Sequence, residues 1–444
     1  MEAETIAVLK RLIRFDTTNP PGNELPLAEW IHQAFGAEGI ESQLLVPAPN
    51  RAVVVARIRG DGPRRPVLLL AHMDVVGVER DKWSCDPFGG IIRDGYLYGR
   101  GAIDDKGMLA ANVMALLLIR RDVVAGGLKL ERDVVFVATS DEEAGGDAGM
   151  KWLVENHRDL LDAEFAINEG GRTRVLPDGK RYLAIQTAEK VSHTVTVTAR
   201  GPAGHAAIPR EGNAIFALAS ALEKLSHYSE PIALTETTRR FFGELAQVWS
   251  DERERSAMRA LASATGEQQL TEPASILARN PVFNAVLRNT ISPTLLGGGV
   301  RTNVIPAEVS AGMNVRTLPG HSIEDVVSRI RRVVPDEDIE ITTSSHGVDS
   351  PASNPDSPMF AALARTAKEL DPEIAVVHYL GTGATDSAQL RRLGINAYGI
   401  LPFPMVPGDE ARMHGHDERV PIASLHFGTR LIYGSVRRIA TAAT

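Results

Sequence analysis

The chain has 444 residues, 43% of them hydrophobic and 23% charged, with a formal net charge of −8 at pH 7. This composition is typical of a globular protein in water, and the length favours two domains over one. An acidic chain without a basic stripe argues against nucleic acid as a partner. The first residues lack the continuous apolar stretch of a signal peptide, and no apolar run reaches transmembrane length. We therefore expect a cytoplasmic protein that binds neither nucleic acid nor membrane.

The first part of the sequence alternates between helical and strand patterns. In chain order, these patterns are helices at residues 6–15 and 25–39, strands at 52–58 and 66–74, a helix at 107–121, and strands at 132–143 and 163–171. The strands are continuous apolar runs, as expected for strands that are covered on both faces. The alternation predicts an α/β domain with a layered helix–sheet–helix arrangement.

The pattern changes near residue 187. The following segments are a strand with period-two alternation at 190–201, a helix at 213–226, a charged and helical region at 235–275, two strands around a proline turn within 300–317, a helix at 322–334 and a strand at 338–345. Strand–helix–strand–strand–helix–strand is a ferredoxin-like order. The α/β pattern resumes with a helix at 357–370, a strand at 394–402 and a helix at 422–441. We therefore predict a discontinuous α/β domain (1–187 and 349–444) with an inserted ferredoxin-like α+β domain (188–348).

Polar side chains gather where the predicted strands end. They are His72 and Asp74, Asp141 to Glu143, Asn168 and Glu169, with Asp104 and Asp105 in a glycine-rich turn and His414 and His416 near the C-terminal end. Alone, each has an ordinary structural explanation, such as turn hydrogen bonding or a charge at a helix N-terminus. Together at the carboxyl edge of a sheet, these carboxylates would repel one another unless a cation lay among them. Because Cys85 is the only cysteine, nitrogen and oxygen ligands for one or two divalent metals are expected.

Eight motifs carry a resemblance to a known family. They are HMDVV, DGYLYGRGAIDDKG, SDEEAGG, NEGG, GPAGHAAIPREGNAI, GGGVRTNVIP, GATDS and HGHDERV. In this order, which covers nearly the whole chain, they resemble the di-zinc aminoacylase, glutamate carboxypeptidase and succinyl-diaminopimelate desuccinylase family of metallopeptidases. The resemblance implies a catalytic domain of the phosphorylase/hydrolase-like fold with two Zn²⁺ ions, replaceable by Co²⁺ or Mn²⁺. It also implies a smaller inserted domain that forms a homodimer and closes as a lid.

The resemblance also implies roles for residues of the catalytic domain. The metal ligands would be His72, Glu143, Glu169, His414 and the bridging Asp104, with His416 as the alternative to His414. Asp74 would orient the imidazole of His72, and Glu142 would be the general base. The bond between Asp104 and its neighbour Asp105 is often cis in this family.

Further residues are implied to bind substrate. His205 matches a histidine that reaches the active site of the partner subunit and stabilises the oxyanion. Asn303 and Arg316 match substrate-binding positions, with Arg316 pairing with a free carboxylate. Gly381, Gly383 and Thr385 match a loop that lines the substrate pocket, although this GTG segment could equally be a plain turn. Many relatives have an arginine after TDS, where this chain has Ala388.

Taken together, these residues predict a metal-dependent hydrolase. We expect it to cleave the amide bond of N-acyl amino acids or small peptides with a free carboxylate, using a water held between two zinc ions and activated by Glu142. A dipeptidase, or a desuccinylase or deacetylase, at the same site is the alternative. A non-catalytic metal-binding scaffold is disfavoured because Glu142 and His205 are both present. The motifs of serine hydrolases and of nucleotide enzymes are absent from the sequence.

Overall fold

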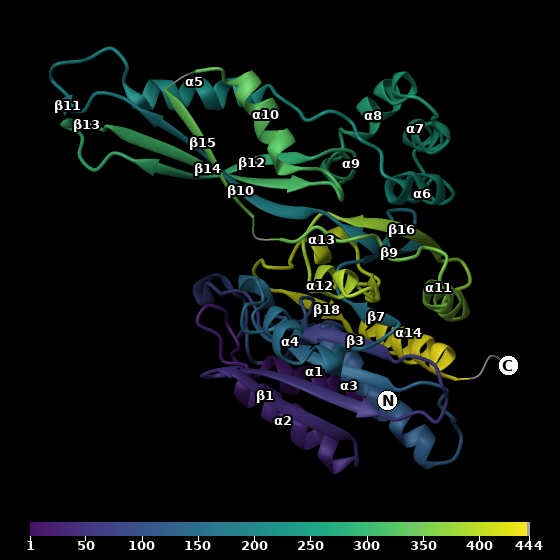
Figure 1. Ribbon diagram of the computed structural model, residues 1–444. Coiled ribbons are helices and arrows are strands. Elements are labelled where there is room, and N and C mark those ends of the chain that lie inside the picture. Colours follow the sequence, from purple (N-terminus) through teal and green to yellow (C-terminus); the bar gives the residue numbers. More distant parts are fainter. Residues whose placement is uncertain (337, 346, 442–444) are drawn as a thin grey trace.

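A nine-stranded sheet forms the centre of the larger part of the molecule (Figure 1). The computed structural model describes residues 1–336, 338–345 and 347–441. In spatial order the strands are β1 (Glu41–Ala48), β2 (Arg51–Ile58), β6 (Val134–Thr139), β3 (Val67–His72), β7 (Phe165–Asn168), β17 (Asn396–Gly399), β9 (Arg181–Glu189) and β16 (Ala375–Gly381), and β8 (Arg172–Val175) pairs with β9. Neighbouring strands β6, β3, β7 and β17 are parallel.

Helices cover both faces of this sheet, which confirms the predicted layered arrangement. One face packs against α1 (Glu2–Ile13), α2 (Leu25–Ala37), α3 (Lys106–Val124), α11 (Pro358–Leu370) and α14 (Ile422–Ala440), and the other against α4 (Met150–Asn156) and α12 (Ser387–Arg392). Strand β3 shows why its sequence is apolar throughout. Leu69 lies in the first of these cores, whereas Leu68 and Leu70 lie in the second.

A smaller sheet joins two segments that are far apart in the sequence. It has the order β18 (Arg419–Pro421), β5 (Tyr96–Tyr98) and β4 (Ile91–Arg93). The antiparallel pairing of β5 with β18 places the glycine-rich turn that follows β5 beside the segment that precedes β18. The short helix α13 (Pro407–Glu410) lies just before that segment.

A second, four-stranded antiparallel sheet confirms the inserted ferredoxin-like unit. Its order is β12 (Thr290–Gly298), β14 (Glu308–Thr317), β10 (Val191–Arg200) and β15 (Ile339–Ser345), and α5 (Ala214–Ser226) and α10 (Ile323–Val333) share its core. The predicted strand before Pro306 is present as β13 (Val304–Ile305), but it is not the second strand of this sheet, because it pairs with β11 (Gly204–His205). The second strand is β12, which the sequence did not reveal because Pro293 and the final glycines interrupt its apolar residues.

The charged region at 235–275 is helical, as predicted, but it packs against the main sheet. Its helices are α6 (Glu236–Leu245), α7 (Glu252–Ser263), α8 (Thr271–Leu277) and the neighbouring α9 (Pro281–Val286). Phe241, Phe242 and Phe283 share a core with Val377 and Tyr379 of β16. Part of the segment 188–348 therefore covers the edge of the larger sheet, and the boundaries 1–187, 188–348 and 349–444 stay predictions. Among the described residues, none of the helices has the length and apolar character needed to cross a bilayer.

Candidate metal centre and active-site cavity

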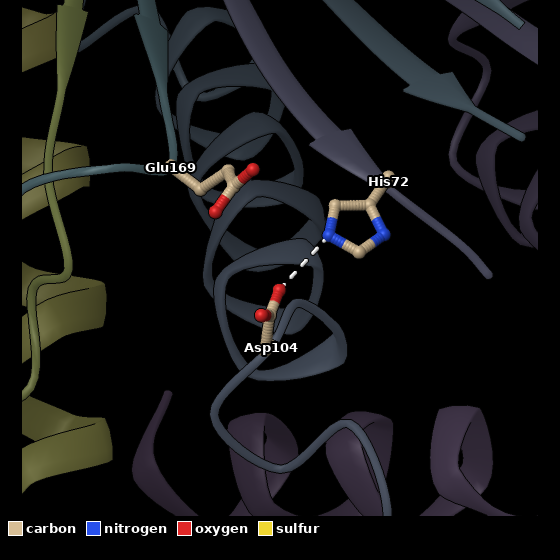
Figure 2. A group of neighbouring side chains, drawn as sticks. All are labelled: His72, Asp104 and Glu169. Carbon is tan, nitrogen blue, oxygen red and sulfur yellow. Dashed lines mark hydrogen bonds and ion pairs between the residues drawn. The ribbon is translucent and has the colours of Figure 1, made fainter. Parts of the chain in front are cut away.

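Two groups of potential metal ligands share one carboxylate. The first group is His72, Asp104 and Glu169, and the second is Asp104, Glu143 and His414. Within each group the candidate ligand atoms lie within 4.8 Å of one another. Figure 2 shows the side chains of the first group pointing toward one another beside α3. The structure therefore brings all five predicted ligands together.

The sheet topology explains how sequence-distant residues meet. His72 is the last residue of β3, and Glu169 directly follows β7, which is parallel to β3. Glu143 lies in the turn after β6, on the other side of β3. Because the carboxyl ends of parallel strands lie at the same sheet edge, all three side chains reach one place. Asp104 arrives from the turn that precedes α3, and its peptide bond to Asp105 is cis.

His72 is buried and held from both sides of its ring. Its Nε2 lies 3.0 Å from Oδ1 of Asp104, and its Nδ1 lies 3.0 Å from the carbonyl oxygen and 3.4 Å from Oδ1 of Asp74. Burial disfavours the charged ring, but hydrogen bonds to Asp104 and Asp74 raise the pKa of His72 well above its usual value. A histidine whose Nδ1 is fixed in this way presents Nε2 to a metal.

Asp74 also holds the turn that carries the predicted general base. Its carboxylate accepts hydrogen bonds from the backbone N–H groups of Glu142 and Glu143, both at 3.1 Å, and from Nδ2 of Asn19 at 2.8 Å. Burial alone would raise the pKa of Asp74, but the hydrogen bond and charge of His72 keep it below its usual value. Asp74 therefore links a candidate ligand to the Glu142–Glu143 turn.

His414 completes the second group, and His416 does not. Nε2 of His414 lies 2.9 Å from Oδ2 of Asp104 and 3.2 Å from Oε1 of Glu143. Hydrogen bonds to these two carboxylates raise the pKa of His414 to about 10. His416 instead contacts Oε2 of the exposed Glu79 at 2.9 Å. The structure therefore favours His414 over its neighbour as the candidate ligand.

Glu142 lies in a strongly acidic environment. Burial, followed by the charges of Asp386 and Glu143, raises the pKa of Glu142 well above its usual value, although His72 opposes the shift. Burial and the charge of Asp104 do the same for Glu169. Buried carboxylates crowded in this way are stabilised by a cation. The nitrogen and oxygen donors of both groups fit a pair of divalent metal ions.

A cavity of about 690 Å³ opens beside the two groups and is lined by both parts of the molecule. Glu142 lies in its wall, as do Arg316 of β14 and the predicted loop residues Gly383 and Thr385. Nε of Arg316 donates to Oδ1 of Asn314 at 3.0 Å. Among the described residues, no carboxylate forms an ion pair with Arg316. Its guanidinium is therefore free to bind an anionic group of a substrate.

The remaining predicted substrate residues are not part of the cavity lining, although Gly381 directly precedes the lining residue Thr382. Gly381 ends β16, and a side chain there would collide with Gln186. His205 and Asn303 lie together on the β11–β13 ribbon, where the N–H of Ala206 donates to the carbonyl of Asn303 at 3.1 Å. This ribbon forms the tip of the second sheet that is farthest from the main sheet (Figure 1). A single chain therefore does not bring His205 or Asn303 to its own cavity.

Glu189 is a pocket residue that was not predicted. It ends β9 and is buried, and its carboxylate accepts from the N–H and the hydroxyl of Thr385 at 3.0 and 2.9 Å and from Nη1 of Arg391 at 2.9 Å. Glu189 thus fixes the loop that contains Thr385. Its position at the end of a strand, like that of Glu169, is the signal that could have identified it.

Several curated relatives are similar to the chain in sequence. It is 31% identical over 374 residues (82% of this chain, 69% of the relative) to the probable carboxypeptidase S-like 2 of Dictyostelium discoideum. It is 28% identical over 459 residues (98% and 87%) to the human N-fatty-acyl-amino acid synthase/hydrolase PM20D1. It is 26% identical over 430 residues (94% and 91%) to human aminoacylase-1.

Solved structures show the same fold. An M20 family metallo-carboxypeptidase from Sulfolobus solfataricus superposes with a TM-score of 0.73 at 18% identity, covering 98% of each chain. A dinuclear metal binding peptidase of the M20 family from Bacillus subtilis gives 0.61 at 15% identity, covering 99% of this chain and 98% of the other. The sequence model described as peptidase family M20/M25/M40 matches residues 68–438. As the motifs predict, the chain belongs to this family and is a metallo-hydrolase.

Proposed function

We propose that the protein is a di-zinc amidohydrolase that cleaves N-acyl amino acids with a free carboxylate. The observation that carries this proposal is the pair of ligand groups that share Asp104, with the half-buried Glu142 beside them in the cavity wall. His72, Asp104 and Glu169 would hold one zinc ion, and Asp104, Glu143 and His414 the other. Co²⁺ or Mn²⁺ would suit the same nitrogen and oxygen donors.

The chain's own residues account for the proton transfers. When bound, two zinc ions supply Lewis acidity, which lowers the pKa of water and polarises the scissile carbonyl. Glu142 accepts the proton of the attacking water on its carboxylate and later donates it to the leaving amine nitrogen. The burial that raises the pKa of Glu142 helps it to hold this proton. Asp74 fixes the backbone of the turn that carries Glu142.

Arg316 in the cavity wall supports an aminoacylase or carboxypeptidase activity, because its guanidinium would bind the substrate carboxylate. Four acidic residues line the cavity besides Glu142 and the ligand groups, namely Asp105, Asp147, Glu189 and Asp386. Glu189 and Asp386 accept hydrogen bonds from the hydroxyl groups of Thr385 and Thr139. Oδ1 of Asp105 has no hydrogen-bond partner among the described residues, so a dipeptidase that binds a free amino group at an acidic residue stays the alternative.

We also propose a homodimer formed by the second sheet. Phe216 of α5 and Leu295 and Leu296 of β12 are 69–75% exposed, and β12 is an edge strand. Exposed apolar side chains on an unpaired edge mark interaction surfaces. In such a dimer, His205 and Asn303 would enter the cavity of the other copy, where His205 would stabilise the oxyanion. Sedimentation of the protein and of Leu296→Asp tests this: the variant should be a monomer with reduced activity.

A substrate panel tests the proposed activity most directly. Zinc-loaded protein is assayed with N-acetyl, N-long-acyl and N-succinyl amino acids and with dipeptides, and the released amino acid is measured. We expect turnover of N-acyl amino acids and loss of turnover after chelation. Turnover of dipeptides alone would favour a dipeptidase, and turnover of succinyl or acetyl substrates alone a desuccinylase or deacetylase. The cytoplasmic location stays a prediction, which cell fractionation tests.

A further inference from the structure

Glu418 is a buried carboxylate that holds the turn leading to Asp104. Its Oε1 accepts hydrogen bonds from the backbone N–H groups of Ile103 at 2.7 Å and Asp104 at 3.1 Å. Its Oε2 accepts from the N–H of Gly101 at 3.1 Å and from Nη1 of Arg100 at 2.6 Å. The side chain of Glu418 has no exposed surface. The carboxylate of Glu418 therefore binds three backbone N–H groups of this turn, those of Gly101, Ile103 and Asp104.

Arg100 connects the same carboxylate to the loop of His414. Its guanidinium is also buried, and Nη2 donates to the carbonyl oxygens of His414 at 3.3 Å, Gly415 at 3.0 Å and Gly77 at 3.2 Å. His414 has a φ of +59°, a left-handed conformation that non-glycine residues rarely adopt. The bonds from Arg100 hold the carbonyl groups on this part of the loop.

Strand pairing sets the register between the two segments. Tyr98 of β5 pairs with Arg419 of β18, and the N–H of Gly99 donates to the carbonyl of Glu418 at 2.9 Å. Arg100 and Glu418 are thus placed side by side by the small sheet. Asp104 follows Arg100 by four residues and His414 precedes Glu418 by four residues, and their side chains lie 2.9 Å apart.

We propose that Glu418 and Arg100 are positioning residues that set the separation and orientation of Asp104 and His414, and thereby the affinity of the second ligand group for metal. This inference rests on the proposed metal centre, but neither residue belongs to it. A carboxylate with four donors and a guanidinium with four acceptors fix geometry more tightly than a single contact does. Outer-shell partners of this kind typically change metal affinity by about 10–100-fold when they are replaced.

Two conservative variants test the proposal, and a third is the control. Glu418→Gln replaces one acceptor oxygen with an NH₂ group that faces other donors. Arg100→Lys keeps the charge but replaces the planar five-donor guanidinium with a compact ammonium group, which cannot hold Glu418 and all three carbonyl oxygens in the same geometry. Glu230→Gln disrupts a comparable buried pair in the second part of the molecule, where Glu230 binds Arg329, Asn289 and Tyr228. Comparison with this control separates an effect on the stability of the fold from an effect on the position of Asp104 and His414.

Zinc titration of the apo proteins by calorimetry, together with hydrogen exchange of the 101–104 segment, gives the decisive readouts. We expect Glu418→Gln and Arg100→Lys to weaken binding of one zinc ion by about 10–100-fold and to speed exchange of this segment. Glu230→Gln should lower the melting temperature and leave both readouts unchanged. Wild-type affinity and wild-type exchange in both site variants would overturn the inference. Failure of the wild-type protein to bind zinc would instead overturn the proposed function. In that case, hydrogen exchange that is unchanged in Glu418→Gln and Arg100→Lys would still refute the positioning role.

Discussion

The two ligand groups of the candidate metal centre are built on different kinds of structure. His72 and Glu169 come from the ends of neighbouring parallel strands in the middle of the main sheet. Glu143 and His414 come from turns, and the residues Asp141 and His414 in these turns have positive φ values of 68° and 59°. The side chain of His72 is 1% exposed, whereas that of His414 is 49% exposed. A sheet edge supplies rigid ligands by itself, whereas ligands on turns depend on the side chains that hold those turns.

Glu142 lies in the cavity wall beside both ligand groups. Its replacement should have the largest effect on activity. Glu142→Gln removes the carboxylate that we propose to accept and return the proton, so we expect kcat to fall by about 10²–10⁴-fold. Zinc content should stay at the wild-type value because Glu142 is in neither ligand group. Steady-state kinetics and elemental analysis of the same preparation measure both quantities. A variant that retained wild-type kcat would refute the assignment of the base.

The two histidines offer a direct test of the difference between the groups. His72→Ala and His414→Ala should each bind one zinc ion fewer than the wild type. Their apo forms should differ in stability, because loss of His72 removes a hydrogen-bonded cation from between the buried carboxylates of Asp74 and Asp104, at a cost of about 3–5 kcal/mol. Loss of the half-exposed His414 should cost under about 1 kcal/mol. Denaturant unfolding measures the two costs, and equal values would contradict the proposed difference.

Replacing Asp74 should weaken the support of the ligand group that contains His72 and Glu169 without removing a candidate ligand. Asp74→Asn places an NH₂ group against the backbone donors of Glu142 and Glu143 or against His72. We expect zinc affinity to fall by about 10–100-fold, which is less than the loss of an ion in His72→Ala. Competition with a chromophoric chelator measures the affinity. An Asn variant that lost an ion altogether would make Asp74 a ligand rather than an orienting residue.

The sequence predicts the ligands of this centre better than their supports. The parallel strands β3 and β6 are recognisable because both of their faces are buried. By contrast, β9 and β16 were missed because Gln186 and His378 interrupt their apolar runs. The ligands follow strand ends and recognisable motifs. Supports such as Glu418, whose partner Arg100 is 318 positions away, depend on tertiary contacts that no local pattern records.

Behind Asp74 lies a buried network that supports this aspartate and the turn of Glu142 and Glu143. Asn19 donates to Asp74 at 2.8 Å and to Asp141 at 3.1 Å, and Arg51 binds Asp141 at 2.9 Å and Glu24 at 2.8 Å. Burial, together with the charge of Asp74, raises the pKa of Glu24 to about 7 although Arg51 opposes the shift. Arg100 and Glu418 hold the other two turns of the centre, those of Asp104 and His414.

This network predicts the smallest effect, a pH dependence of stability in the apo protein. The pKa of Glu24 is higher in the folded state than in the unfolded chain, so the folded state binds more protons between about pH 4.5 and pH 7. The contribution of Glu24 to stability is therefore fully present below this window and is lost as the pH rises through 7. The slope is at most about 1.4 kcal/mol per pH unit. Glu24→Gln should remove it in urea unfolding measured across this range, while Glu230→Gln, which alters a different buried pair, should keep it. If wild type and Glu24→Gln showed the same slope, Glu24 would be ionised in the folded protein, and Arg51 rather than burial would control its charge.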